Sequence, residues 1–314
     1  MSVNLRKVAV VGCGFVGSAS AFALMQSGLF SEMVLIDVDK ERAEGEALDI
    51  GHGMPLARPM QIYAGDYDDA ADAAIIVVTA GANQKPGETR LDLVKKNAEI
   101  FKSIIPEIAK RNCQGVMLVV SNPVDILTYI AVKLSNMPAG HVFGSGTVLD
   151  TARLKYLLSE HLNVDSRSIH TAIIGEHGDS EFATWSTTNV SSVPLHDFCE
   201  MRGYHNHQEA MKNLENSVRN SAYEIIKRKK ATYYGIAMSV KRICEAVIRD
   251  EKSVLPVSSL ITNAYGINDV ALSVPAIVGK DGVECLVPDN LNGEERAKLQ
   301  ESAKILRDII KTVM

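Results

Sequence analysis

A glycine-rich turn between a β-branched run and a helical run constrains the fold of this chain more than any other stretch. Residues 7–11 are strand-like, residues 12–17 read Gly-Cys-Gly-Phe-Val-Gly, and a helix-forming run follows until Gly28. A strand, then GxGxxG, then a helix is the context that the dinucleotide fingerprint requires. The glycines allow a tight turn and let a pyrophosphate approach the helix N-terminus, where backbone N–H groups attract anions. The turn therefore predicts a dinucleotide site.

An acidic residue ends the next strand-like run. Asp37 follows residues 33–36 and stands twenty positions after Gly17. A carboxylate at this point accepts hydrogen bonds from the ribose hydroxyls of NAD and repels the additional phosphate of NADP. Asp39 strengthens that repulsion, whereas Arg42 lies within reach of the same region and weakens it. A glycine turn followed by an unrelated surface acid stays open as the alternative, but the pattern favours NAD.

Strand-like and helical runs go on alternating through the first half of the chain. Predicted strands lie at 60–64, 74–79, 116–120 and 141–144, and predicted helices lie at 42–53, 91–111 and 124–134. This alternation, with continuously apolar strands, indicates a doubly wound parallel α/β sheet, whose ligands bind at the carboxyl ends of the strands. One crevice should therefore collect the residues at those ends, which are Gly12, Asp37, Gly81, Ala82, Ser121 and Asn122.

Residues 81–90 form a polar loop at the carboxyl end of one of these strands. Gly81, Pro86 and Gly87 predict an irregular segment that could hinge over the crevice. The loop also carries Gln84, Lys85 and Arg90. An ordinary solvated loop is the alternative, but its position in a chain with a cofactor motif favours a lid.

A histidine with small neighbours is the first candidate for proton transfer. His177 follows an apolar run and Gly175, and histidine gives or takes a proton near neutral pH. A lone histidine beside acids is more often an ordinary polar residue. Asp150 and Arg153 are three positions apart, so on a helix they share a face. They could form a simple salt bridge, or they could face the crevice, orient a histidine and bind a carboxylate.

The second half of the chain loses the strict alternation. Residues 183–189, 254–261 and 274–278 resemble strands of a mixed or antiparallel sheet, and residues 208–227, 233–249 and 293–313 are predicted helices. We therefore predict a dinucleotide-binding Rossmann domain at 1–145 and an α+β substrate-binding, catalytic domain at 146–314.

Composition excludes several other classes of protein. The net charge of −5 gives no basic surface for nucleic acid, and no apolar run approaches the roughly 18 residues that span a bilayer. The first residues lead directly into a strand, so we expect no cleavable signal. Five scattered cysteines without a CxxC pair favour a reducing cytoplasm and no zinc site. The His-Asn-His run at 205–207 has no third ligand in view, and we interpret it as surface.

Six ordered motifs give the chain a family resemblance from end to end. They are GCGFVG at 12–17, GANQKPGETR at 81–90, SNPVD at 121–125, VLDTAR at 148–153, GEHGDS at 175–180 and KATYYG at 230–235. With these motifs the chain resembles the bacterial NAD-dependent L-lactate dehydrogenases of the lactate/malate dehydrogenase superfamily. The resemblance implies reversible hydride transfer between NADH and pyruvate, as the last step of lactic fermentation, in a cytoplasmic homotetramer. It implies no metal, because the cofactor carries the hydride.

The resemblance also implies a part for each site residue. His177 would protonate the pyruvate carbonyl oxygen, Asp150 would pair with His177, and Arg153 would bind the substrate carboxylate through two hydrogen bonds. Arg90 would enter with the lid and stabilise the oxygen where negative charge develops. The other substrate-binding positions implied are Gln84, Asn122, Asp125 and Thr232, and the cofactor-binding positions implied are Gly12, Gly14, Val16, Gly17, Asp37, Arg42, Tyr67, Gly81, Ala82, Ser103, Val120, Ser121, Asn122 and Ser145.

Gln84 should decide the substrate. Malate dehydrogenases have an arginine at the corresponding lid position, which pairs with the second carboxylate of the substrate. Glutamine is neutral, so a dicarboxylate would bury an uncompensated charge at a cost of several kcal/mol. Pyruvate or a somewhat larger 2-oxo acid is therefore favoured. The alternatives are a malate or other L-2-hydroxy acid dehydrogenase, or a nucleotide-binding protein without activity.

Many members of this family are tetramers that fructose 1,6-bisphosphate activates at a subunit interface. His170 matches the histidine of that site, whereas Lys155 replaces its arginine. Lysine still attracts phosphate but lacks the planar fork. Activation is therefore expected to be possible but weakened, and His170 as a simple strand-end residue is the alternative.

Overall fold

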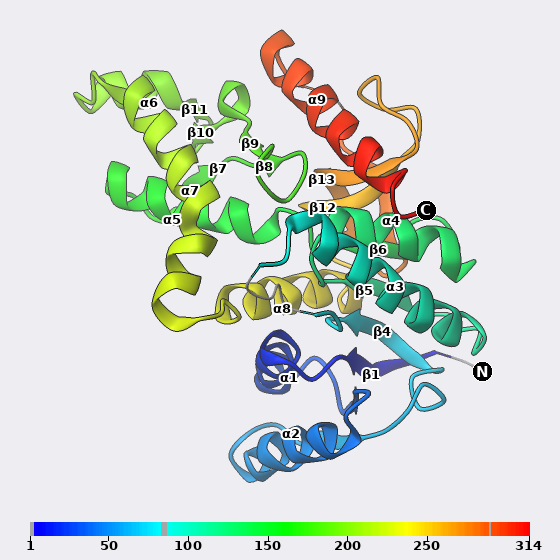
Figure 1. The fold of residues 1–314 in the computed structure, drawn as a ribbon. Helices are drawn as coiled ribbons and strands as arrows, with labels where there is room; N and C mark the ends of the chain where they lie inside the picture. The colour runs from blue at the N-terminus through cyan, green and yellow to red at the C-terminus, as the bar shows by residue number, and fades with distance from the viewer. Residues whose placement is uncertain (1–2, 83–86, 289) are drawn as a thin grey trace.

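A large twisted sheet with helices on both faces forms the centre of the molecule (Figure 1). The computed structural model describes residues 3–82, 87–288 and 290–314, and for Arg90 the backbone alone. In this part of the chain nine strands join in the order β14-β13-β12-β6-β5-β4-β1-β2-β3. The predictions for Gln84 and Lys85, and that for the side chain of Arg90, concern groups outside the described residues.

The parallel half of this sheet confirms the predicted Rossmann arrangement. Its strands run in the order 3-2-1-4-5-6, the order of the doubly wound dinucleotide-binding fold. Their bounds are β1 (Asn4–Val11), β2 (Glu32–Ile36), β3 (Gln61–Ala64), β4 (Ala73–Val78), β5 (Val116–Val119) and β6 (Val142–Gly144). Each is entirely or largely apolar because helices cover both faces.

Alternate side chains of β1 enter two different cores. Val8 and Val10 pack against α1 (Phe15–Ser27), α2 (Lys40–His52) and α8 (Tyr234–Ile248). Ala9 and Val11 face the core shared by α3 (Arg90–Ala109), α4 (Val124–Ser135) and α9 (Gly293–Ile310). Two of these helices, α8 and α9, come from the second half of the chain. The second half therefore stabilises the nucleotide-binding sheet directly.

The three long strands of the second half extend the main sheet, whereas its short strands form two small separate antiparallel sheets, β11-β10-β7 and β8-β9. The strands β12 (Ser253–Ile261), β13 (Val270–Gly279) and β14 (Gly282–Leu286) pair antiparallel with one another. Ser258 of β12 lies opposite Gly144 of β6, so they continue the parallel sheet as its far edge. No local pattern predicts this junction, because it joins positions more than a hundred residues apart.

The strand predicted at 183–189 is wrong. The segment divides into β9 (Phe182–Ala183), a 3₁₀ turn at Trp185–Thr187 and β10 (Asn189–Val190). Side chains from distant helices interrupt the ladder there. The indole N–H of Trp185 donates to Glu215 at 2.8 Å, and the backbone N–H of Ser186 donates to Glu295 at 2.9 Å.

A smaller apolar core lies beside the sheet. Leu154, Leu158 and Leu162 of α5 (Val148–Leu162) pack with Val218 of α7 (His207–Lys229). The short strands β7 (Ile169–His170), β8 (Ile173–Ile174) and β11 (Val193–Pro194), and helix α6 (Leu195–Met201), complete this region. Of the helices described, none is long and apolar enough to cross a membrane.

Candidate active site

The predicted glycine turn is closely fitted between β1, α1 and β4. Gly12 has φ +100°, and a Cβ added there would lie 2.5 Å from the backbone nitrogen of Ala80. A Cβ at Gly17 would lie 1.8 Å from the carbonyl oxygen of Gly12, so both positions require glycine. A Cβ at Gly14, in contrast, would meet no atom of the described residues within 4 Å. Open space at the helix N-cap leaves α1 free to receive an anion.

Asp37 lies beside this turn, as the twenty-residue spacing predicts. Its Oδ2 accepts the backbone N–H of Cys13 at 2.6 Å, and its Oδ1 accepts that of Asp39 at 3.0 Å. The carboxylate is therefore held at the carboxyl end of β2, and each oxygen retains a lone pair for a further donor. Arg42 is exposed on the first turn of α2, where Asp39 caps its backbone N–H. These residues fit the adenosine half of a dinucleotide.

The other predicted cofactor residues lie mostly at the ends of β4, β5 and β6. The Ser121 hydroxyl donates to the carbonyl of Ala80 at 2.6 Å, and Asn97 of α3 links Ala82 and Asn122 through hydrogen bonds at 2.8 Å. Asn97 is 2% exposed, and sequence reasoning missed it because nothing in the local pattern separates it from an ordinary helix polar residue. Gly81, Val120 and Ser145 follow the ends of β4, β5 and β6, Val16 lies in the first turn of α1, and Tyr67 is half-buried after β3.

Ser103 is not drawn into this arrangement. It is exposed on α3, and its hydroxyl donates to the carbonyl of Ile100 within the same helix. No hydrogen bond described for this residue joins it to the strand-end loops.

His177, Asp150 and Arg153 come together as one hydrogen-bonded group. The ring Nδ1 of His177 lies 2.6 Å from Oδ2 of Asp150, and Nη1 of Arg153 donates to Oδ1 of the same carboxylate at 2.7 Å. Asp150 and Arg153 share a face of α5, whereas His177 follows β8. The aspartate–arginine spacing therefore gives the expected salt bridge, and Asp150 also faces a histidine, while binding of a carboxylate by Arg153 stays a prediction.

The group keeps a proton on the imidazole. Burial alone would lower the pKa of His177, but the charge and hydrogen bond of Asp150, with smaller effects of Glu181 and Asp125, raise it to about 9. Burial likewise acts to raise the pKa of Asp150, yet His177 and Arg153 outweigh it and hold that pKa below its usual value. At neutral pH the pair is thus an imidazolium and a carboxylate, with the ring ready to donate a proton.

Asp125 holds the backbone of His177 in place through a hydrogen bond. Its Oδ2 accepts the backbone N–H of His177 at 2.7 Å, and its Oδ1 accepts the hydroxyl of Ser258 at 2.6 Å. The carboxyl group is 1% exposed, and burial raises its pKa to about 6. The structure therefore shows Asp125 as a positioning residue that ties α4, the histidine loop and β12 together.

Replacing Asp125 with Ala should lower the free energy of unfolding by about 2–3 kcal/mol, because it leaves the buried His177 N–H and the Ser258 hydroxyl without an acceptor. Urea unfolding followed by circular dichroism measures the change. Asp308→Ala, at an exposed position on α9, is the matched control and should change stability by less than about 0.5 kcal/mol. Equal stability of the two variants would contradict the structural role of Asp125 as a buried hydrogen-bond acceptor.

A pocket of about 230 Å³ opens onto the group. His177, Asp150 and Arg153 line it together with Asn122, and α3 and α7 contribute the apolar side chains of Leu93, Ala222 and Ile226. The lining thus combines a few polar and charged groups with apolar side chains, as in sites for small organic acids. Thr232 is half-buried in the loop between α7 and α8, and among the described residues it is not part of this lining.

Glu181 and Arg219 also line this pocket, and the sequence analysis named neither. Glu181 is 4% exposed, its Oε2 lies 3.9 Å from Nδ1 of His177, and burial with the charge of Asp150 raises its pKa to about 8. Arg219 of α7 donates to the carbonyl oxygen of Glu181 at 2.8 Å. The GEHGDS motif could have pointed to Glu181, which directly follows it, but only the fold brings Arg219 there.

The two residues predicted for an allosteric anion lie away from this pocket. His170 is exposed at the end of β7, and it lines a second cavity of about 260 Å³. Lys155 is half-buried on α5, which packs against β7, and burial lowers the pKa of its ammonium group.

Comparisons with known proteins agree with one another over the whole chain. Residues 6–144 match the model of the lactate/malate dehydrogenase NAD binding domain, and residues 147–314 match that of the lactate/malate dehydrogenase alpha/beta C-terminal domain. The chain is 54% identical over 309 residues to an L-lactate dehydrogenase of Acetivibrio thermocellus, with 98% of each chain covered. It is 53% identical to an L-lactate dehydrogenase of Thermoanaerobacterium saccharolyticum, with 98% of this chain and 99% of that one covered.

Solved structures give the same result. A lactate dehydrogenase from a Medee basin deep-sea metagenome library superposes with a TM-score of 0.95 at 46% identity, covering 100% of this chain and 99% of that one. The ligand-bound minor L-lactate dehydrogenase of Enterococcus mundtii superposes with a TM-score of 0.94 at 44% identity and 98% coverage of both chains.

Proposed function

Since this chain belongs to the lactate/malate dehydrogenase family, we propose that it is an L-lactate dehydrogenase, which reversibly converts pyruvate, NADH and a proton into (S)-lactate and NAD⁺. One observation carries the proposal most directly. A protonated histidine and an arginine share the carboxylate of Asp150 in the lining of a small pocket. A 2-oxo acid needs a proton donor at its carbonyl oxygen and a cation at its carboxylate, and this group supplies both.

NADH supplies the hydride when it is bound, and the protein's residues prepare the substrate. The guanidinium of Arg153 binds the pyruvate carboxylate, and the imidazolium of His177 donates its proton to the carbonyl oxygen as the alcohol forms. Asp150 holds the ring orientation and stabilises its charge. In the reverse direction the neutral imidazole takes the hydroxyl proton of lactate. Arg90, whose side chain lies outside the described residues, is proposed to stabilise the developing oxyanion from the lid.

The cofactor is proposed to be NAD rather than NADP. The N-terminus of α1, with open space at Gly14, fits a pyrophosphate, and the Asp37 carboxylate at the end of β2 fits two ribose hydroxyls. A phosphate on the ribose would meet the negative charges of Asp37 and Asp39.

We also propose a domain boundary after Ser145, a homotetrameric assembly and a cytoplasmic location. The five cysteines, four of them buried, are unpaired in the structure, which suits a reducing compartment.

Pyruvate should be the preferred substrate, by roughly 100-fold in kcat/KM over oxaloacetate, because Gln84 gives a second carboxylate no cationic partner. Oxidation of NADH with pyruvate, oxaloacetate and 2-oxoisocaproate measures this preference, each with and without fructose 1,6-bisphosphate. A higher specificity constant for oxaloacetate would favour malate dehydrogenase instead.

If Lys155 and His170 bind fructose 1,6-bisphosphate, the bisphosphate should lower the apparent KM for pyruvate. An unchanged KM would contradict the proposed allosteric site but not the proposed dehydrogenase activity.

The pH profile should report the raised pKa of His177. Pyruvate reduction needs the protonated ring, so its kcat/KM should stay level between pH 6.5 and 8 and fall above about pH 9. Lactate oxidation needs the neutral ring, so its kcat/KM should rise as the pH approaches about 9. In Asp150→Asn the carboxylate that raises this pKa is absent, so both limbs should move to lower pH. Identical profiles for Asp150→Asn and the unmodified enzyme would contradict the assignment.

A further inference from the structure

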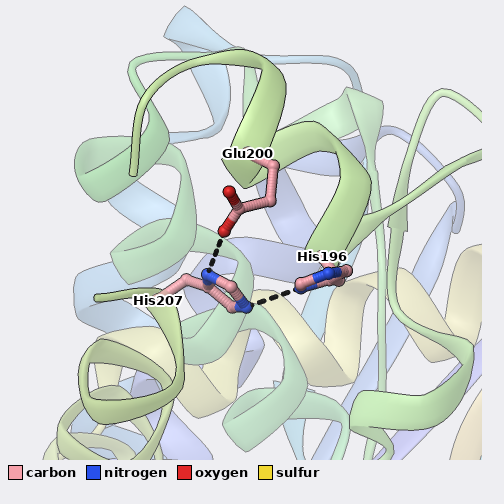
Figure 2. Close-up of side chains that lie close together, drawn as sticks. All are labelled: His196, Glu200 and His207. Atoms are coloured by element: carbon pink, nitrogen blue, oxygen red, sulfur yellow. Dashed lines mark hydrogen bonds and ion pairs between the residues drawn. The ribbon is translucent and has the colours of Figure 1, made fainter. Parts of the chain in front are cut away.

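Two histidines and a glutamate meet where α6 is followed by α7, and none of the three lines the pocket of His177. His196 and Glu200 lie on α6, and His207 is the first residue of α7 (Figure 2). The sequence interpretation of 205–207 as a surface run without a third ligand was therefore incomplete. Figure 2 shows the ring of His207 between the other two side chains, with one nitrogen toward each.

Two neighbouring oxygens determine which ring nitrogen of His207 carries the proton. Its Nδ1 lies 3.1 Å from the carbonyl oxygen of Tyr204 and 3.4 Å from Oε1 of Glu200. Both oxygens can only accept, so Nδ1 carries the proton and Nε2 presents a lone pair. His207 is 6% exposed, which holds the ring in this orientation. An N–H donated to a backbone carbonyl or a carboxylate, with the opposite nitrogen free, is the arrangement that orients histidines which bind metals.

The Nε2 of His207 faces a second imidazole and is hydrogen-bonded to it. This nitrogen lies 2.8 Å from Nδ1 of His196, and one ligand atom from each of His196, Glu200 and His207 lies within 4.8 Å of the others. His196 and Glu200 are one helical turn apart on the same face of α6, and both are exposed. Ligand nitrogens about 2.1 Å from a tetrahedral ion stand about 3.4 Å apart. A small outward movement of the exposed His196 ring therefore makes room for an ion.

We propose that His196, Glu200 and His207 form a binding site for a divalent transition-metal ion such as Zn²⁺, Ni²⁺ or Cu²⁺. His207 contributes Nε2, His196 contributes Nδ1, and water completes the shell, while Glu200 faces the Nδ1–H of His207 and holds the ring in its ligating orientation. Two imidazole ligands suit these ions better than Mg²⁺ or Ca²⁺, which prefer oxygen ligands. Binding would hold the N-terminal end of α7 against α6, and α7 carries Arg219 and Ile226 of the active-site pocket.

The other described group with suitable geometry is Asp150, His177 and Glu181. There the Nδ1 of His177 already faces Asp150 at 2.6 Å, and Arg153 occupies the second oxygen of that carboxylate. That group is therefore accounted for by proton transfer, and a metal experiment must separate the two places.

Calorimetric titration of the untagged, chelator-treated full chain with ZnCl₂ tests the proposal. We expect one site per chain, at least about tenfold weaker in His196→Ala and in Glu200→Gln. These two residues are exposed, so the substitutions should not disturb folding. His52→Ala, which removes an exposed histidine at the end of α2, is the matched control and should bind as the unmodified chain does. Zinc should also raise Tm by roughly 3 °C in the unmodified chain and the control, but not in His196→Ala.

Electron paramagnetic resonance with Cu²⁺ identifies the ligands. The unmodified chain should show hyperfine coupling to two imidazole nitrogens, and His196→Ala should show coupling to one. Unchanged zinc affinity in both His196→Ala and Glu200→Gln would overturn the proposal. So would loss of binding in His177→Asn with retention in His196→Ala, because the ion would then lie in the active site.

Discussion

Replacing His177 with Asn should lower kcat for pyruvate reduction by about 10³-fold while leaving the Kd for NADH nearly unchanged. The amide of asparagine cannot donate a proton to the carbonyl oxygen. Its backbone N–H can still donate to Asp125, so the loop should keep its position. The predicted cofactor residues around Gly12 and Asp37 belong to other elements, β1 and β2. Steady-state kinetics and titration of NADH fluorescence measure the two quantities separately.

A matched substitution at another histidine shows whether the loss of activity is specific to the position of His177. His52→Asn, at an exposed position in the last turn of α2, should retain full activity. A decrease of less than about tenfold in His177→Asn would assign proton donation to another group. Glu181 would then be the first candidate, since its carboxyl lies 3.9 Å from the histidine ring and carries a raised pKa of about 8.

The parts of this site that were predictable from sequence are those in which local spacing determines geometry. The strand–glycine–helix order at 12–17 and the acid at Asp37 require only neighbouring elements, and the structure brings them together. Asp150 and Arg153 follow from helical periodicity, which places residues three apart on one face. The parallel sheet was predictable too, because the alternation of strands and helices is a local pattern along the chain.

What was missed depends on contacts between distant segments. Arg219 reaches Glu181 across 38 positions, and Ser258 reaches Asp125 across 133. No periodicity predicts such pairs, because the fold and not the local spacing brings them together. The strand expected at 183–189 is wrong for the same reason. Glu215 and Glu295 accept hydrogen bonds from Trp185 and Ser186, and the position of their helices beside this segment could not be predicted from the pattern. The continuation of the sheet from β6 into β12 is a further case.

Replacing Arg153 with Lys should lower kcat/KM for pyruvate by about 100-fold, mainly through a higher KM. Among the residues that the structure describes, Asp150 accepts from Nη1 of the guanidinium at 2.7 Å, and the arginine side chain is 14% exposed in the pocket wall. Its remaining N–H groups can bind a carboxylate in two parallel hydrogen bonds, which an ammonium cannot reproduce. Steady-state kinetics with pyruvate give the two constants, and binding of oxamate, an isostere of pyruvate that is not reduced, should weaken in parallel.

The pH profile distinguishes substrate binding from support of Asp150. If Arg153 acts chiefly on the substrate, the lysine variant should keep its falling limb near pH 9, because Asp150 still faces His177 at 2.6 Å. If Arg153 serves mainly to hold Asp150, the limb should move while the affinity for oxamate stays constant. Asp150→Asn provides the comparison, since there the limb should move whatever the substrate contact. A lysine variant with unchanged KM and unchanged oxamate affinity would show that another cation binds the carboxylate, and Arg219, which lines the same pocket, would be the group to replace next.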